Sequence, residues 1–421
     1  MNDFLSIDKT LSSKFQNEIN ISIVFNYLRE KGPISRARIS KELGLSAPSV
    51  SKVISLLEEK GYILEVGQEK TIVGVRPKLL KINTEGYVIG VDLGKKKVKI
   101  ALTNFYGDFI TKDIGFSTPS NIEVDDKKII KDLISLIKSV IHKAEYKKLV
   151  NPSALKAICF AVSAPVSLET GKIVDIPLYG NYKKIDFEGV FGKEFNVPVA
   201  VENDVNCSAF AEKTMIDDKQ IEDIIFIEIS RGVGSGIIIN NRIFKGFNGT
   251  SGEIGNSIVN TSNLNFKIRN KGFLEKYASV EGVKKVAVNG IMKGKESLIT
   301  EIVGGELKNI EASDVCLAAL KGDKFAEKVI KNAVDLLSIA FLNLILIIDP
   351  QVISIGGDIC LLPESRKLFL DPIIKKINHA FPFKMPEIRF SLASEDAGML
   401  GASLIAIESL ILKEFPFKIN F

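Results

Sequence analysis

The sequence predicts an α/β protein in which a small winged helix-turn-helix domain precedes a two-lobed body. Three observations support this fold class. The first 82 residues contain helix-spaced apolar residues interrupted by helix-stop residues, whereas from Gly86 onward short apolar strands alternate with amphipathic helices. That alternation occurs in two series, and a chain of 421 residues is too long for one ordinary hydrophobic core. We therefore expect three domains, over residues 1–82, 86–205 and 206–421, with the last helix a candidate to return to the first lobe.

Three helices and a β-hairpin are expected in the first domain. A helix over residues 20–31 has helical apolar spacing and ends at Gly32-Pro33. Ser35 is expected to cap a short second helix, and Ser46 to cap a third with Pro48 in its first turn, where proline is tolerated. The predicted buried stripe consists of Leu45, Val50, Ile54, Leu56 and Leu57. Residues 62–83 should form two short strands around a polar, glycine-containing tip, which is a wing.

The body is predicted from two successive series of strands and helices. The first series has strands over 87–94, 97–105, 155–162 and 197–201 and an amphipathic helix over 127–142. The second has strands over 224–230, 236–244 and 352–357 and a helix over 334–348. Such alternation is typical of α/β lobes, and two series indicate two lobes with a cleft between them.

The composition, with 46% apolar and 25% charged residues, is that of a soluble globular protein. The richest apolar run, residues 339–348, is too short to span a bilayer, and the N-terminus lacks a signal pattern. We therefore expect a cytoplasmic protein with no membrane partner. The cysteines are Cys159, Cys207, Cys316 and Cys360. They are scattered without a CxxC pair, so reduced, buried thiols are expected.

The second and third helices of the first domain carry the residues expected to contact DNA. Small polar groups and a lysine, which can approach phosphates and base edges, lie at the start of the third helix: Ser46, Ser49, Ser51 and Lys52. Arg36 and Arg38 can hold the backbone from the preceding helix, and the wing tip holds Lys70 and Arg76, suited to a narrow minor groove. The alternative is a helical bundle used only for protein contacts, but its polar, basic face would make a poor apolar interface.

Four motifs follow the first domain in order: IGVDLG (89–94), ENDVN (202–206), the glycine-rich segment 232–256 and DPQVISIGGD (349–358). This order of motifs resembles that of the ROK family of repressors and sugar kinases. Residues 32–63 are similar to the DNA-binding domain of its repressor branch, whose members respond to xylose, glucose or N-acetylglucosamine. The resemblance covers essentially the whole chain. It implies an actin/hexokinase-like (ribonuclease H-like) body of the sugar-kinase type.

The resemblance also implies the sugar-binding residues, which are Asn203, Asp204, Glu253, Asn256 and Glu275. Asn203 and Asp204 follow an apolar strand, and the carboxyl ends of strands are where open α/β sheets bind ligands. Asp204 stands at the position of the kinases' catalytic base, and Glu253 should accept hydrogen bonds from hydroxyls. The alternative for Asn203 and Asp204 is a role only in capping a turn.

The zinc site of the family is predicted to be lost. Asn256 replaces the histidine that follows GEIG in most members, and an amide is a poor zinc ligand. The cysteine-rich segment of the family corresponds to residues 266–275, where Phe266, Ile268 and Phe273 stand at the cysteine positions. An apolar plug is expected in place of the metal, and no cofactor is expected.

Two phosphate-binding turns also depart from the family pattern. Lys95 and Lys96 replace the second glycine and the threonine of DxGGTK, and Arg231 replaces the threonine of GTGxG. Bulky side chains where backbone amides should face phosphates are expected to prevent the close fit that phosphoryl transfer requires. Gly356-Gly357 is retained, but tight strand–helix packing would also require it.

These features predict a non-enzymatic, sugar-responsive DNA-binding transcription regulator. We expect a repressor that a monosaccharide or derivative, bound between the lobes, releases from a double-stranded DNA operator. Release, not recruitment, follows from the commoner behaviour of the family. Because helix-turn-helix proteins bind paired half-sites, a homodimer or higher homo-oligomer is expected. Two alternatives stay open: an active ATP-dependent sugar kinase with an appended DNA-binding head, and a regulator that responds to a partner protein instead of a sugar.

Overall fold

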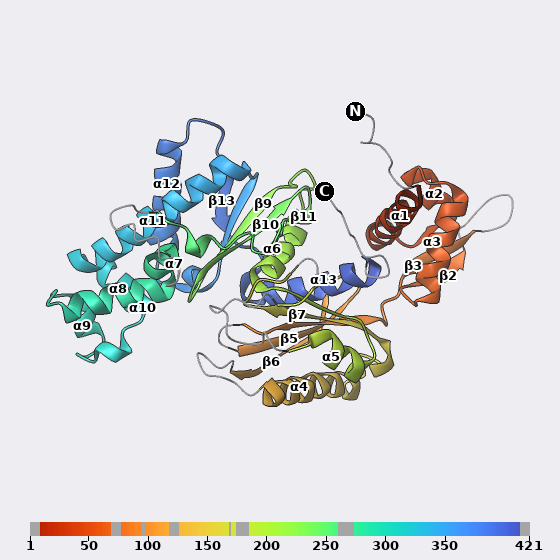
Figure 1. Ribbon diagram of the computed structural model, residues 1–421, viewed down its shortest axis with the longest axis horizontal. Coiled ribbons are helices and arrows are strands. Elements are labelled where there is room, and N and C mark those ends of the chain that lie inside the picture. The colour runs from red at the N-terminus through yellow and green to blue at the C-terminus, as the bar shows by residue number, and fades with distance from the viewer. Residues whose placement is uncertain are drawn as a thin grey trace. The chain divides into compact units, whose positions relative to one another are not determined.

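The computed structural model forms two compact units (Figure 1). The first comprises Met1–Ala161, Lys184–Val201 and Ala402–Phe421, and the second Val162–Lys183 and Glu202–Gly401. The residues that the structure describes are 9–68, 77–94, 97–117, 126–167, 170–173, 185–259 and 273–412. The winged domain and the first α/β lobe thus belong to one unit. The last helix begins in the second unit and ends in the first.

The head, residues 9–82, is a winged helix-turn-helix domain. Its elements are α1 (Lys9–Lys31), β1 (Ile34–Ser35), α2 (Arg36–Leu43), α3 (Ala47–Glu59), β2 (Ile63–Gln68) and β3 (Lys78–Ile82). The strands form an antiparallel sheet in the order β1-β3-β2. Helix α3 buries Val50, Val53, Ile54 and Leu57. The predicted stripe was therefore wrong in omitting Val53, and Leu45 and Leu56 are only half-buried.

The ends of the head helices test the capping residues and helix boundaries that the sequence predicted. The Ser46 side chain accepts a hydrogen bond from the Ser49 backbone N–H at 3.3 Å, which confirms it as the cap of α3. Ser35 occupies the N-cap position of α2, but its side chain makes no capping hydrogen bond. Helix α1 begins at Lys9, well before the predicted start at Asn20, because residues 9–19 carry no proline or glycine to interrupt it.

The first lobe is a mixed sheet with α4 (Asp126–Tyr146) and α5 (Phe187–Phe195) on one face (Figure 1). Its elements are β4 (Tyr87–Asp92), β5 (Lys97–Asn104), β6 (Phe109–Ser117), α4 (Asp126–Tyr146), β7 (Leu155–Val162), α5 (Phe187–Phe195) and β8 (Val199–Asn203). The strand order is β6-β5-β4-β7-β8, antiparallel from β6 to β4 and parallel between β4 and β7. Phe160 on β7 packs against Phe187 and Phe191 of α5, which fixes that helix to the sheet.

The head is attached to the first lobe by direct contacts. The Phe105 ring, at the end of β5, meets Phe25 of α1 and Tyr62 at centroid distances of 6.3 and 5.6 Å. The Lys156 ammonium donates to the Lys60 carbonyl at 3.1 Å. Within the connection, residues 83–86, the Asn83 amide donates to the Gly61 carbonyl at 2.8 Å. The connection is therefore a hydrogen-bonded part of the head and not a free linker.

The second unit contains a five-stranded sheet and most of the helices. Its elements are α6 (Asp204–Met215), β9 (Ile224–Ile229), β10 (Val233–Ile239), β11 (Arg242–Ile243), α7 (Phe273–Ala278), α8 (Val280–Met292), α9 (Leu298–Ile302), α10 (Ala312–Leu320), α11 (Lys324–Ile348), β12 (Val352–Gly356), α12 (Asp371–Ala380), β13 (Glu387–Phe390) and the first residues of α13 (Ala397–Leu412). The strand order is β11-β10-β9-β12-β13, antiparallel from β11 to β9 and parallel from β9 to β13. This order repeats that of the first lobe.

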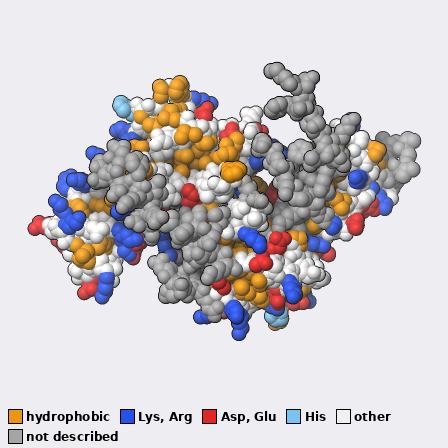
Figure 2. All heavy atoms as spheres, viewed as in Figure 1, with side chains coloured by type: hydrophobic (Ala, Val, Ile, Leu, Met, Phe, Trp, Pro, Cys, Tyr) orange, Lys and Arg blue, Asp and Glu red, His pale blue; other side chains and the backbone are white. Residues whose placement is uncertain are grey.

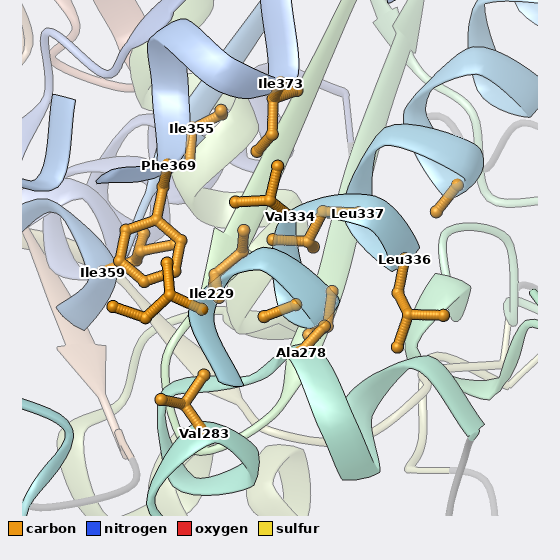
Figure 3. Packing of buried hydrophobic residues seen from close by; sticks show 14 of the residues in the cluster. Ile229, Ala278, Val283, Val334, Leu336, Leu337, Ile355, Ile359, Phe369 and Ile373 are labelled. Atoms are coloured by element: carbon orange, nitrogen blue, oxygen red, sulfur yellow. The ribbon is translucent and has the colours of Figure 1, made fainter. Parts of the chain in front are cut away.

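Alternate residues of β9 face two different sets of helices. Ile224 and Phe226 join the apolar cluster that includes Val205 and Ala209 of α6. Ile225, Ile227 and Ile229 join the main core, which gathers around α11 (Figure 3). Helix α11 is long and apolar enough to cross a membrane by composition, yet it is the central core helix of this unit. It begins at Lys324, ten residues before the predicted start, because Asp323 caps it by accepting from the Ala326 N–H at 2.7 Å.

The cysteines are packing residues. Cys159, Cys207 and Cys316 are buried and Cys360 is half-buried, and all four are free thiols. Burial raises the pKa of Cys316 and of Cys360 to about 12, so neither thiol ionises at neutral pH. In the described parts of the chain, no group of three or more His, Cys, Asp or Glu side chains is arranged to hold a metal ion.

Candidate functional site

The exposed start of α3 carries the predicted DNA-contacting residues. Ser46, Ser51 and Lys52 are exposed, and Ser49 is half-buried, its hydroxyl 2.8 Å from that of Ser46. A face of short polar side chains lets a helix approach a groove closely. On the side of the molecule shown in Figure 2, basic and acidic side chains are interspersed.

The two arginines of α2 are differently placed from one another. Arg36 is half-buried and pairs with Glu58 of α3 at 2.8 Å and with Glu65 of β2 at 3.4 Å, so it ties the head together. Arg38 is exposed and pairs with Glu42 one turn on, at 2.6 Å. A phosphate must compete with these carboxylates for either guanidinium. Lys70 and Arg76, predicted to contact DNA from the wing, lie outside the described residues.

The predicted sugar residues Asn203 and Asp204 form the start of α6. The Asn203 side chain accepts from the backbone N–H groups of Val205 and Asn206 at 3.0 and 3.1 Å, and donates to the Ala164 carbonyl at 3.3 Å. Asn203 therefore caps the helix, as the alternative interpretation expected. Asp204 is a buried residue, 7% exposed, at the first helical position, where the helix dipole stabilises its carboxylate.

The loop after β11 carries Glu253 and is fastened to β10. Ser235 on β10 donates to the Gly252 carbonyl through its backbone N–H at 2.8 Å and through its hydroxyl at 3.0 Å. Gly252 has φ +90°, and a Cβ there would lie 1.9 Å from the Ser235 carbonyl oxygen. Only glycine fits this approach. The next residue, Glu253, is half-buried at the start of a short 3-10 helix, Ile254–Asn256.

Glu275 and the short helix that contains Asn256 approach the same strand. The Glu275 carboxylate accepts from the Val233 backbone N–H, at the start of β10, at 3.3 Å. A Cβ on Gly255 would lie 2.3 Å from the Val233 carbonyl oxygen and 3.3 Å from the Glu275 Cβ, so these segments are in direct contact. Asn256 is exposed, and its amide lies 3.5 Å from the Glu253 carboxylate.

Strand β10 is therefore contacted by three separate segments that carry the predicted sugar residues. On its other side, Gly234 and Gly236 allow α6 to approach, since a Cβ on Gly236 would lie 2.6 Å from the Val205 carbonyl oxygen. The sequence interpretation missed Ser235 and the pair formed by Lys245 and Glu202, which connect the site residues. The alternating glycines of VGSG were the available signal, because they mark close backbone approach.

The second phosphate turn and the retained glycine pair contact each other. The Asp358 backbone N–H donates to the Ser230 hydroxyl at 2.9 Å, and a Cβ on Gly357 would lie 2.6 Å from that hydroxyl oxygen. Close packing against Ser230 is therefore sufficient to explain why a glycine occupies position 357. Arg231 is exposed in this turn. Lys95 and Lys96 of the first turn lie outside the described residues, as do Phe266 and Ile268 of the predicted apolar plug.

Comparison with known proteins decides the family. The model of the ROK family matches residues 88–409, which is most of the chain. The chain belongs to the ROK family. A winged helix-turn-helix DNA-binding model matches residues 17–63, ahead of the ROK region. The predicted combination of a winged head with a ROK body is confirmed.

Two relatives that match nearly the full length of the chain are transcription regulators. The xylose repressor of Caldicellulosiruptor bescii is 28% identical over 405 residues, covering 95% of this chain and 97% of that protein. The DNA-binding transcriptional dual regulator NagC of Escherichia coli K12 is 28% identical, with 90% of each chain covered. These relatives place the chain among the sugar-responsive DNA-binding repressors of the ROK family.

Solved ROK structures confirm the predicted actin/hexokinase-like fold. A ROK transcriptional regulator described as a homologue of the E. coli MLC protein has a TM-score of 0.77 and 25% identity, covering 94% of this chain and 98% of that one. A ROK glucokinase from Streptomyces griseus has a TM-score of 0.62 and 22% identity. It covers 76% of this chain but 99% of its own, so the two share the body fold, and this chain has additional residues.

Replacing Gly252 by alanine is expected to weaken sugar binding at least about tenfold, because the new Cβ must displace the loop that carries Glu253. Isothermal titration calorimetry measures the effect. Gly294 is a matched control, since it has a similar φ of +85° and no atom lies within 4 Å of the place a Cβ would take there. Gly294→Ala should lower the melting temperature but leave sugar affinity unchanged. Equal sugar affinity in both variants would contradict the role of this loop.

Proposed function

We propose that this ROK protein is a repressor that a monosaccharide releases from its operator. The observation that carries the proposal is that β10 is contacted by helix α6, which begins with Asp204, by the loop that carries Glu253, and by the Glu275 carboxylate, in a chain that also carries a winged head. Carboxylates are strong acceptors for the several hydroxyl groups of a sugar, and their placement from separate segments suits a ligand with hydroxyls on several carbons. Sugar binding then shifts the equilibrium between two arrangements of the protein that differ in operator affinity.

The charge of the proposed site favours a neutral sugar over a sugar phosphate. Asp204, Glu253 and Glu275 are all acidic, and the nearby Lys245 is already paired with Glu202. A phosphate ester would bring negative charge toward these carboxylates, which is unfavourable in a partly buried site. The xylose repressor relative is consistent with a neutral effector.

The winged head implies two proposed partners, operator DNA and further copies of this chain. The exposed start of α3 is proposed to lie in the major groove, with Arg38 and the wing on the backbone and minor groove. Because an operator read by a helix-turn-helix has two half-sites, we propose a homodimer or larger homo-oligomer. Access to chromosomal DNA makes the cytoplasm the proposed location.

We propose that the body has no kinase activity. Arg231 in the second phosphate turn, and Lys95 and Lys96 in the first, stand where the resemblance places small residues in the kinases. Two relatives that match 90% or more of the chain are a xylose repressor and a DNA-binding transcriptional dual regulator. No turnover above background is expected in an ATP-coupled assay with D-xylose, D-glucose, N-acetylglucosamine and N-acetylmannosamine. Turnover that disappears in Asp204→Asn would overturn this proposal.

A thermal-shift screen with operator gel shifts tests the whole proposal. At least one neutral monosaccharide should raise the melting temperature and, at the same concentration, release the operator. The corresponding sugar phosphates should stabilise the protein less. If no sugar or sugar phosphate stabilises the chain, a partner protein becomes the better candidate for the effector. If a sugar stabilises the protein but does not change operator binding, sugar binding by the body does not control repression.

A further inference from the structure

A buried ion pair joins two of the segments that carry the proposed sugar residues. The Lys245 ammonium, on the loop after β11, pairs with the Glu202 carboxylate at the end of β8. The Glu202 side chain is only 5% exposed and that of Lys245 27%. The other Glu202 oxygen accepts from the Asn203 backbone N–H at 2.9 Å and from the Asn206 side-chain amide at 3.0 Å. Both carboxylate oxygens are thus engaged next to the start of α6.

The backbone of Lys245 closes the loop that leads to Glu253. Its carbonyl accepts from the Ser251 N–H at 3.1 Å, one residue before Gly252. Inside the loop, Gly249 has φ +72° and lies directly against residue 166, since a Cβ would be 2.1 Å from the Val166 carbonyl oxygen. Lys245 therefore lies at the base of a closed loop, and its side chain reaches Glu202 at the end of β8, directly before Asn203 and the start of α6 at Asp204.

We infer that Lys245, through its ion pair with Glu202, is a positioning residue that holds the Glu253 loop at a fixed distance from Asp204. The inference rests on the proposed sugar-binding function. A sugar that contacts both carboxylates needs them at the separation set by its hydroxyls, and a loop free to move must be ordered at the expense of binding energy. The pair supplies that order before the sugar arrives.

Charge compensation alone would be a different role, and the two roles predict different outcomes. Lys245→Met leaves the Glu202 carboxylate buried without its counter-charge, which destabilises the unit whether or not the site is affected. The double variant Glu202→Gln with Lys245→Met removes both charges and retains an oxygen for Asn203 and Asn206. It should regain most of the parent melting temperature.

The experiment is calorimetric titration of the full chain with whichever of D-xylose, D-glucose or N-acetylglucosamine stabilises the parent most. We expect the double variant to bind that sugar at least about tenfold more weakly, about 1.4 kcal/mol. Lys245→Arg, which keeps the charge and the reach, should restore binding to within about threefold of the parent. Operator binding without sugar should be unchanged in all variants.

A control variant separates site effects from general destabilisation. Lys284 pairs with Glu311 at 2.8 Å and is 24% exposed, close to the exposure of Lys245, but it lies on α8. Lys284→Met should leave the sugar affinity unchanged. Parent-like affinity in the double variant would overturn the inference while leaving the proposed function intact. If the parent itself binds none of the three sugars, the proposed function fails first, and the two failures are thereby distinguished.

Discussion

Asp204→Asn is expected to weaken sugar binding about ten- to hundredfold and to make repression insensitive to sugar. The carboxylate is buried at the first position of α6, so a sugar hydroxyl that donates to it forms a charge-assisted hydrogen bond. Asparagine keeps the shape but replaces one acceptor oxygen with a donor. Loss of such a bond typically costs about 1.5–3 kcal/mol. Calorimetric titration gives the affinity, and a gel shift should show the operator complex surviving sugar that dissociates the parent complex.

The matched control is Asp323→Asn, a substitution of the same type at the N-cap of α11 in the same unit. Burial would raise the pKa of Asp323, but hydrogen bonds from the backbone N–H groups of Ala326 and Leu298 lower it overall. The control variant should therefore lose some stability and retain its sugar affinity. Parent-like sugar affinity in Asp204→Asn, measured beside this control, would remove Asp204 from the site.

Lys52→Glu is expected to weaken operator binding at least about tenfold at about 0.1 M salt. Lys52 is exposed on α3, so it can approach a phosphate, and the substitution replaces attraction with repulsion. The dependence of log affinity on log salt should also become shallower by about one ion per head, because one phosphate contact is lost. Gel shifts or fluorescence anisotropy at several salt concentrations measure both quantities.

Lys295→Glu provides the same charge change at an exposed turn of the second unit. It should leave operator affinity and its salt dependence nearly unchanged, which excludes a general effect of net charge. The melting temperature of Lys52→Glu should match the parent, since the side chain is exposed. Operator binding by Lys52→Glu equal to that of Lys295→Glu would show that this face of α3 does not contact DNA.

The strand–helix alternation predicted the fold well where the local signals were strong. Strands β4, β5, β7, β9 and β12 lie where apolar runs predicted them. Helix α6 was not predicted, because its inward face carries polar groups such as Asn206 and Glu212 that are buried in hydrogen bonds. Glu212, for example, is fully buried and pairs with Arg389 of β13 at 2.7 Å. Sequence periodicity treats such residues as exposed, and only long-range contacts reverse that assignment.

The sequence predicted the individual residues of the candidate site but not how they are arranged in space. The motifs identified Asp204, Glu253 and Glu275, whereas the strand that unites them is recognisable only once Gly252 and Gly255 are seen against it. The Lys245–Glu202 pair spans 43 residues of sequence, and no local pattern links its members. For Asn203, local helix capping competes with a ligand role, and the structure shows the capping bonds directly.

The attachment of the head to the first lobe has a consequence for how operator spacing could be controlled. The Phe105 ring contacts both Phe25 and Tyr62, and the Asn83 side chain hydrogen-bonds the connection to the head. When the first lobe rotates, the attached head and its helix α3 therefore rotate with it, because no flexible linker separates the two. In a dimer of such chains, the distance between the two α3 helices would therefore depend on the orientation of the first lobes. A lobe rotation of a few degrees would then move the α3 helices out of register with the two half-sites of the operator.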